Sequence, residues 1–448
     1  MARPSSRSLV AVFGLILACA GVASAQVVQR PPRAYRTLFG PPVVDPNRSR
    51  QEFSVTGSLL GGYDDNLTPI STSPQELFTP RPSGFSGIGE ARARYLRGRQ
   101  ARSLELLGGG AVYAYRGLDL APEYAADAQA RFTVPVGRRH RLLAVQGIRS
   151  EPFYLLGAFA PLLPGLDLDS RPATTSASGF SVRRSRVLDS TVSFQASLSR
   201  DHLLTMAAGY NDRTFDDDFG NSRAVSGSAD YTYMVGRASG FRATYRFADS
   251  ENLNEDGINR PIEYHVLSGG YTYEKHLSAT RRFQLIVGGG TTHVKTTITP
   301  FEYWTPSAYA STRFDWARSW SVWLDYSRRV AVLEGLSVDP YTTDSLVVWT
   351  GGLVHPRVEV VGSGTWSNGQ AAPDNNGRFD TYSASSQVRL LLARWYSFVL
   401  SHSFYAHRLN DFTTLPAGMI TRLDQHIVRV GLTFDLPLYG RYLDRVRP

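Results

Sequence analysis

Apolar and polar residues alternate with a period of two from Glu52 onward, in segments of about 12 to 16 residues. In the last segment the even positions from Val428 to Phe434 are apolar, whereas the odd positions from Arg429 to Asp435 are polar or glycine. Residues 192–198 and 241–247 alternate in the same way. Successive side chains of a strand point to opposite faces, so each segment predicts a strand with one apolar and one polar face.

The pattern resolves into about 18 such segments, separated by turn-forming residues. Their connections alternate in length, and every second one is long. The long set includes residues 64–83, 152–187, 250–260, 368–376 and 409–420. Short turns on one side and longer loops on the other are typical of bacterial outer-membrane barrels. We therefore predict an all-β fold, a transmembrane antiparallel up-and-down β-barrel of about 18 strands, within a range of roughly 16 to 18.

Composition agrees with this fold class. The chain has 448 residues, of which 42% are hydrophobic and 12% aromatic, and its mean hydropathy is -0.22. These values fit neither a disordered chain nor a helical membrane protein. Tyr and Trp gather near segment ends, as at membrane interfaces. Those toward the long connections are Tyr63, Tyr115, Tyr124, Tyr210 and Trp366; those toward the short turns are Tyr95, Trp316, Trp320, Trp395 and Tyr396. A soluble propeller or β-helix is the competing interpretation, although the chain lacks a blade-length repeat.

The N-terminus has the three parts of a secretory signal peptide. Arg3 and Arg7 precede an apolar stretch from Leu9 to Ala20, and residues 23–25 read Ala-Ser-Ala. We predict cleavage after Ala25. Residues 26–50 are then a Pro-rich periplasmic leader, residues 51–436 the outer-membrane barrel, and residues 437–448 a short periplasmic tail. The only cysteine, Cys19, lies inside the signal, where its acylation is an open alternative.

The sequence predicts no enzyme and no cofactor or metal. It contains no G-x-S-x-G, H-E-x-x-H or P-loop motif. His402 and His407 are five residues apart and would face opposite sides of one strand. Asp216 to Asp218 offer oxygen ligands for Ca²⁺, but a solvated acidic loop is the favoured interpretation. The formal charge of +9 rests mainly on arginine, and an exported chain does not meet nucleic acid.

The polar faces of the predicted strands would line the lumen, with both charges interspersed. Candidate lumen residues are Glu90, Arg92, Arg94, Asp127, Arg131, Asp230, Arg242, Arg246, Arg313, Asp315, Trp323, Asp325, Arg329, Arg357, Glu359 and Arg389. One interpretation is a lattice of ion pairs between neighbouring strands. The other is a polar pathway in which arginines and aromatic rings contact hydroxyl-rich or acidic solutes. Spacing alone does not separate the two.

Two short motifs resemble known outer-membrane proteins. Tyr63, Asp64, Asp65 and Asn66 resemble the Tyr-Asp-Asp-Asn signature after the first strand of porin-like barrels associated with exopolysaccharide or capsule systems. Residues 429–436 resemble the β-signal read by the barrel assembly machinery, with Arg429, Gly431, Phe434 and Leu436 at its characteristic positions. They depart from that signal in one respect, because twelve further residues, 437–448, follow.

The resemblance implies a passive conduit for exopolysaccharide or capsule export in the Gram-negative outer membrane. A general diffusion porin for small solutes is the alternative, and a closed structural or adhesive barrel is a third. In the last case the apolar loop 152–187 would plug the lumen. Expected partners are outer-membrane lipid and lipopolysaccharide, the barrel assembly machinery and periplasmic polysaccharide-export components.

Overall fold

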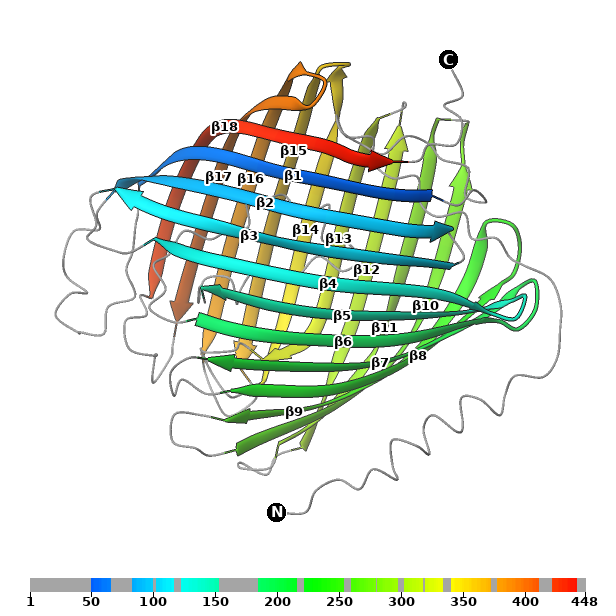
Figure 1. Cartoon of the computed structure of the whole chain (residues 1–448). Coiled ribbons are helices and arrows are strands. Elements are labelled where there is room, and N and C mark those ends of the chain that lie inside the picture. Colours follow the sequence, from blue (N-terminus) through cyan, green and yellow to red (C-terminus); the bar gives the residue numbers. More distant parts are fainter. Residues whose placement is uncertain are drawn as a thin grey trace.

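Each alternating segment of the sequence forms one strand in the computed structural model, and the strands join into a single antiparallel sheet of eighteen (Figure 1). The structure describes residues 50–65, 83–99, 102–116, 122–152, 184–215, 221–253, 259–278, 280–296, 302–316, 319–332, 340–371, 377–410 and 421–440. The strands are β1 Arg50–Asp64, β2 Gly84–Arg99, β3 Arg102–Arg116, β4 Glu123–Val136, β5 His140–Pro152, β6 Arg184–Ser197, β7 His202–Phe215, β8 Ser222–Met234, β9 Ser239–Leu253, β10 Asn259–His276, β11 Arg282–Thr296, β12 Glu302–Trp316, β13 Trp320–Val332, β14 Pro340–His355, β15 Val358–Ala371, β16 Arg378–Ala393, β17 Tyr396–Asn410 and β18 Arg422–Gly440.

The sheet closes on itself because β1 pairs with both β2 and β18. All other pairs join strands that follow one another in the chain. The predicted fold class and strand number are therefore confirmed. Closure also gives every described strand a partner on both sides, which is what allows a sheet to span a bilayer.

The two ends of the barrel differ as the sequence predicts. The even-numbered connections are short, from two residues between β14 and β15 (356–357) to five between β10 and β11 (277–281). The odd-numbered connections are mostly longer, up to residues 153–183 between β5 and β6. We call the end of the barrel with the short connections the turn end and the end with the longer connections the loop end.

The last strand is longer than the pattern indicates. We expected the barrel to finish at residue 436, but β18 continues to Gly440, and Phe53 and Tyr439 are paired at the start of β1. Several other expectations lie outside the described residues. They are the signal peptide 1–25, the leader up to residue 49, Asn66, the loop core 153–183, Asp216 to Asp218 and the tail from residue 441.

The outward face of the barrel is apolar. Leu59 is 69% exposed and Leu267 62% exposed, and Val428, Val430 and Leu432 line the outside of β18 at intervals of two residues. Large apolar side chains left open to this extent are costly in water, whereas hydrocarbon accommodates them. This exterior is that of an outer-membrane β-barrel. Within the described ranges, no helix is long and apolar enough to cross a membrane.

Aromatic side chains gather on this outward face near both rims. Toward the turn end Trp316 and Trp320 stack with ring centroids 5.7 Å apart. Toward the loop end Tyr63 meets Phe85 edge-on at 5.4 Å. The two predicted aromatic belts are thus present, with one correction. Tyr115 lies at an odd position of β3 and shares the inward face of that strand with Glu105, because the alternation continues unbroken to the end of β3.

Candidate functional site: the inner wall of the barrel

The inward face of the barrel is identified by side chains that meet across an intervening strand. Arg92 on β2 extends over β3 to Asp127 on β4, with 3.0 Å between Nη2 and Oδ1. Gly109 of β3 lies beneath it, where an added Cβ would stand 3.2 Å from Nε of Arg92. Side chains of alternate strands converge only on the concave side of a closed sheet. These residues therefore face the lumen.

One carboxylate joins two arginines beside this pair. Glu105 on β3 accepts from Arg94 of β2, with 2.6 Å between Oε1 and Nη2. Its other oxygen lies 3.7 Å from Arg131 of β4. The Glu105 side chain is only 11% exposed, so both arginines offset the cost of burying its charge. The wall from β2 to β4 is therefore cross-linked by ion pairs.

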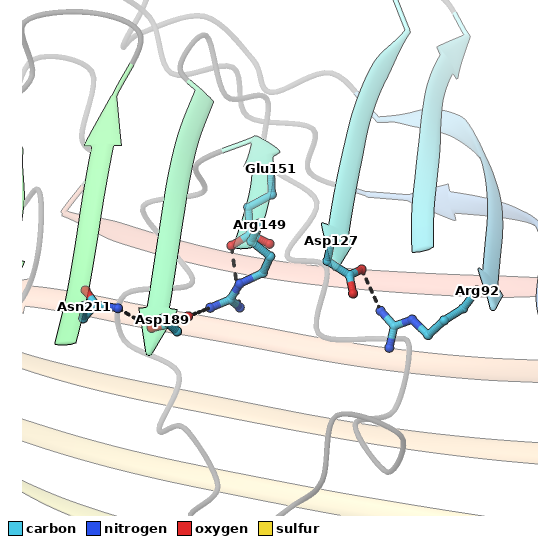
Figure 2. A network of polar contacts seen from close by, with 6 residues as sticks. All are labelled: Arg92, Asp127, Arg149, Glu151, Asp189 and Asn211. Carbon is cyan, nitrogen blue, oxygen red and sulfur yellow. Dashed lines mark hydrogen bonds and ion pairs between the residues drawn. The ribbon is translucent and has the colours of Figure 1, made fainter. Parts of the chain in front are cut away.

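A second network continues the charged wall from β5 to β7. Arg149 lies 3.2 Å from Asp189 and 3.9 Å from Glu151, and Asn211 donates from its amide to Asp189 (Figure 2). Asp189 therefore holds together β5, β6 and β7. Arg149, Asp189 and Asn211 occupy the inward positions of their strands, although they are not among the lumen residues predicted from the sequence.

The same arrangement recurs around the rest of the barrel. On β8 and β9, Asp230 accepts from Arg242 Nη2 at 2.6 Å and from Thr244 Oγ1 at 2.5 Å. On β12, Arg313 Nε donates to Asp315 at 2.8 Å. On β15 and β16, Arg389 lies 3.7 Å from Glu359. We call the inward faces of β2 to β9 the charged sector.

Apart from the Glu359 and Arg389 pair, the polar groups on the inward faces of β14 to β17 are mainly hydroxyls. Ser363 and Ser385 are hydrogen bonded at 2.7 Å, and Thr365 and Ser383 at 2.5 Å. Ser367 donates to Ser345 at 3.1 Å. The inward serines and threonines on these strands are Thr343, Ser345, Ser363, Thr365, Ser367, Thr381, Ser383, Ser385, Ser397, Ser401 and Ser403. We call this the hydroxyl sector.

Two indole rings lie where the hydroxyl sector begins. Trp323 of β13 and Trp349 of β14 face inward as a directly paired couple, with ring centroids 6.0 Å apart. The guanidinium of Arg313 lies 5.0 Å above the Trp323 ring. A cation over a ring face is attracted by its quadrupole. The three side chains therefore form a platform with apolar faces and a charged edge.

Two lumen arginines, one in the middle of β9 and one toward the loop end of β13, have no carboxylate partner in the described part of the chain. Arg246 of β9 and Arg329 of β13 are both exposed, and both interact electrostatically with Tyr264 of β10 and with each other. Like charges on one wall repel each other unless an anion or water intervenes. The arrangement is suited to receiving an anionic group.

The inner wall also has an apolar region that the alternation did not predict. Leu60 of β1, Ile88 of β2 and Val399 of β17 form a buried cluster, against which Tyr113 of β3 packs. Val399 reaches the others across β18, where it faces Gly431. This cluster lies at the junction of the first and last strands, so it packs where the barrel closes.

The Tyr-Asp-Asp part of the signature motif spans the same junction. Asp64, which is fully buried, accepts two hydrogen bonds from Gln425 Nε2 of β18, at 3.0 and 2.9 Å. Asp65 accepts from the backbone N–H of His426 at 2.7 Å and donates its own N–H to the His426 carbonyl. These two aspartates therefore join β1 to β18 by hydrogen bonds at the loop end.

The residues that resemble a β-signal lie along this junction too. Arg429 pairs with Gly62, Gly431 with Leu60, Phe434 with Gly57 and Leu436 with Val55. An added Cβ at Gly57 would stand 2.4 Å from the Phe434 ring, so the ring covers the bare glycine. An added Cβ at Gly431 would stand 2.0 Å from the Leu59 carbonyl oxygen. Both glycines are required by close approach of the two strands.

The predicted lumen residues occupy inward strand positions, with one exception. Arg357 lies in the two-residue turn between β14 and β15 and is exposed at the turn end. We had counted it as part of a strand, but β14 continues to His355 and β15 begins only at Val358. Arg357 is therefore not part of the inner wall.

The histidines form no metal site in the part of the chain that the structure describes. No group of three or more His, Cys, Asp or Glu there is placed to hold an ion. His402 faces outward and stacks on His426 with ring centroids 5.6 Å apart, whereas His407 is fully buried on the inward face. The two histidines of β17 thus point to opposite sides, as their spacing predicts.

Comparisons with known proteins return solved barrels but no sequence relative. No family model matches the chain, and no curated protein matches it. Among solved structures, OccAB2 of Acinetobacter baumannii is 9% identical over 87% of this chain and 98% of its own, with a TM-score of 0.47. OccK5 (OpdH) of Pseudomonas aeruginosa is 9% identical over the same shares, with a TM-score of 0.45. The siderophore receptor PirA of Pseudomonas aeruginosa is 9% identical over 85% of this chain and 80% of its own, with a TM-score of 0.41.

Proposed function

We propose that this outer-membrane barrel is a passive conduit for hydroxyl-rich chains, and that its physiological cargo is an exported exopolysaccharide. The observation that carries the proposal is the half-buried part of the hydroxyl sector, which is Ser363, Thr365, Ser383, Ser385 and Ser403, together with the half-buried Trp323 ring. Hydroxyls of the wall exchange hydrogen bonds with hydroxyls of a saccharide at little net cost, and indole faces pack against the C–H faces of sugar rings. The motif resemblance at Tyr63 to Asp65 supports the same cargo.

Weak contacts at many positions suit movement of a long polymer. Conduction requires sites that bind well enough to admit a solute and weakly enough to release it. In the hydroxyl sector several wall hydroxyls already have a hydrogen-bond partner, as in the Ser363 and Ser385 pair and the Thr365 and Ser383 pair. A sugar would therefore replace one hydrogen bond with another instead of filling an empty site. The charged sector on β2 to β9, across the lumen from the hydroxyl sector, would keep its own part of the wall hydrated.

The orientation of the barrel follows from its even strand number. Both chain ends would lie on the periplasmic side at the turn end, with the mature chain beginning at Gln26 after the signal. The Pro-rich leader would then be available to periplasmic export components, and the barrel assembly machinery would read residues 429–436. Mass spectrometry of the mature N-terminus and crosslinking from residues 26–49 test these two expectations.

A deletion strain tests the cargo. The strain lacking the protein is expected to lose surface polysaccharide while retaining uptake of small solutes, and the wild-type gene should restore it. Complementation with Trp323→Ala should restore it poorly, because the substitution removes an inward ring. Trp304→Ala is the matched control, since Trp304 is 67% exposed on the outward face. Normal surface polysaccharide in the deletion strain, together with reduced solute uptake, would identify a general porin instead.

Arg246, Arg329 and Tyr264 favour a second candidate function, which is passage of small anionic solutes. Two uncompensated cations on a lumen wall raise the local concentration of anions. The reversal potential of the refolded channel in a KCl gradient measures this preference. The double variant R246Q/R329Q should lower the chloride-to-potassium permeability ratio, and the outward-facing control R116Q should not. An equal ratio in all three proteins excludes this candidate.

A further inference from the structure

The outward faces of β14 to β17 carry a shallow apolar groove at the level of Trp366 and Tyr382. Its volume is about 310 Å³, and it is lined by Leu346, Val348, Gly364, Trp366, Tyr382, Ala384 and Phe404 among others. Gly364 and Ala384 are directly paired on β15 and β16 and form the floor, because neither has a large side chain. Trp366, Tyr382 and Phe404 stand around them as walls.

A row of charged and polar residues lies beside this groove, on its loop-end side. The residues of the row are cross-strand neighbours, and on β15 and β16 they are the next outward-facing pair after Trp366 and Tyr382. The row consists of Arg328, Asp344, Asn368, Asp380, Arg408 and Arg422. Arg378 lies one pair further, beside Gln370. Residues two apart on a strand are about 7 Å apart, and neighbouring strands about 4.8 Å. A single lipid headgroup can therefore contact this row while its chain lies in the groove.

The carboxylates of the row are already engaged by neighbours. Asp344 accepts from the Tyr326 hydroxyl at 2.7 Å and lies 3.5 Å from Arg328. Asp380 accepts from the Asn368 amide at 2.7 Å.

Two arginines remain exposed with no carboxylate partner in the described ranges, Arg378 and Arg408. They lie on adjacent strands, since Arg408 is paired with Asp380, two residues from Arg378. Guanidinium groups in this arrangement are suited to bidentate binding of phosphate.

We propose that this composite surface binds one phosphorylated, multiply acylated glycolipid of the outer leaflet, of the lipid A type. Arg378 and Arg408 hold a phosphate, Asn368 and Gln370 face the sugar headgroup, and one acyl chain fills the groove over Gly364. The inference rests on the orientation given above, in which the loop end faces the outside of the cell. It does not depend on what passes through the lumen.

Charge complementarity and continuity of the two surfaces support this occupant. A second copy of the chain would bring its own Arg378 and Arg408 against these cations or leave them buried without partners, which is costly. A lipid with phosphate and saturated chains satisfies both the arginines and the groove.

Native mass spectrometry of the refolded full chain, titrated with bisphosphorylated hexa-acyl lipid A, tests the proposal. The double variant R378Q/R408Q should weaken binding about tenfold, because it removes both charge-assisted contacts to phosphate. The control R116Q/R223Q changes two outward arginines of the loop end on β3 and β8 and should bind as wild type. Phosphatidylglycerol, titrated in parallel, should bind at least tenfold more weakly than lipid A.

The groove has its own variant. An added Cβ at Gly364 would come no closer than 3.9 Å to its nearest neighbour, so Gly364→Leu can be accommodated without disturbing the strand while filling the floor. It should weaken lipid A binding and leave binding of the deacylated, phosphorylated disaccharide unchanged. Equal lipid A binding by wild type, R378Q/R408Q and G364L would overturn the proposal, and so would equal affinity for phosphatidylglycerol. Channel conductance of the same variants should match wild type, which separates this result from the proposed conduit function.

Discussion

The hydrogen bonds between Asp64 and Gln425 make a sharp prediction about barrel closure. They join the first strand to the last, between residues 361 positions apart in sequence. Replacing Asp64 with alanine removes the acceptor of both bonds and leaves the side-chain amide of Gln425, which is 1% exposed, facing a cavity in place of the carboxylate. We expect the loop end of the junction to loosen.

The magnitude follows from the geometry. The two distances, 3.0 and 2.9 Å, are those of good hydrogen bonds, and the acceptor is a carboxylate. A hydrogen bond to a charged group contributes about 1.5–3 kcal/mol, and a buried polar group left unpaired costs about 1–3 kcal/mol. Asp64→Ala should therefore lower the free energy of unfolding by about 2–4 kcal/mol. Asp64→Asn keeps one acceptor and should cost roughly half as much.

Urea unfolding of the refolded barrel in phospholipid vesicles, followed by tryptophan fluorescence, measures these values. A double-mutant cycle of Asp64→Ala and Gln425→Ala isolates the pair, and we expect a coupling energy of about 1.5–3 kcal/mol. Asp201→Ala is the control, because Asp201 is an exposed carboxylate in a short turn, and it should change stability by less than about 0.5 kcal/mol. If the two single substitutions changed the free energy of unfolding additively, the proposed coupling between Asp64 and Gln425 would be refuted.

Three further predictions concern closure, the membrane face and the charged sector. Gly431→Val should abolish the heat-modifiable folded form on gels, because its Cβ would stand 2.0 Å from a carbonyl oxygen of β1. Gly61→Ala, in the same pair of strands, should fold normally because nothing lies within 4 Å of its Cβ. Leu59→Arg should destabilise the barrel in vesicles by about 2–4 kcal/mol, and an effect no larger than that of Leu59→Ala would argue against a lipid-facing position. Glu105→Gln leaves two arginines without their shared carboxylate, so bilayer reversal potentials should shift toward anion selectivity; a shift toward cations would contradict the assigned ion pairs.

The strand architecture was predictable because it depends on local alternation. The odd and even positions of β18 separate as expected, with Arg429 inward and Val430 outward, and the strand number of eighteen is confirmed. Errors fell at strand ends, where turns carry the same polar residues as the inward face. Arg357 is the example, because a turn arginine and an inward arginine are indistinguishable from spacing alone.

Contacts between strands were not predictable from the same pattern. The register decides that Asp189 meets Arg149 and Asn211, and that Arg92 reaches over a glycine to Asp127, and no single segment encodes it. The cluster of Leu60, Ile88 and Val399 was missed for a related reason. Its residues occupy polar-face positions in three different strands, and only closure brings them together.

Single-channel conductance of the refolded mature chain in a planar bilayer tests the central claim most directly, when acidic and neutral oligosaccharides are added on one side. The conduit account predicts a stable open conductance that saccharides interrupt, with shorter interruptions in Trp323→Ala and unchanged interruptions in Trp304→Ala. An open conductance indifferent to saccharides would contradict the proposed cargo. No conductance from a folded, heat-modifiable barrel would contradict the conduit itself and identify a closed structural or adhesive barrel.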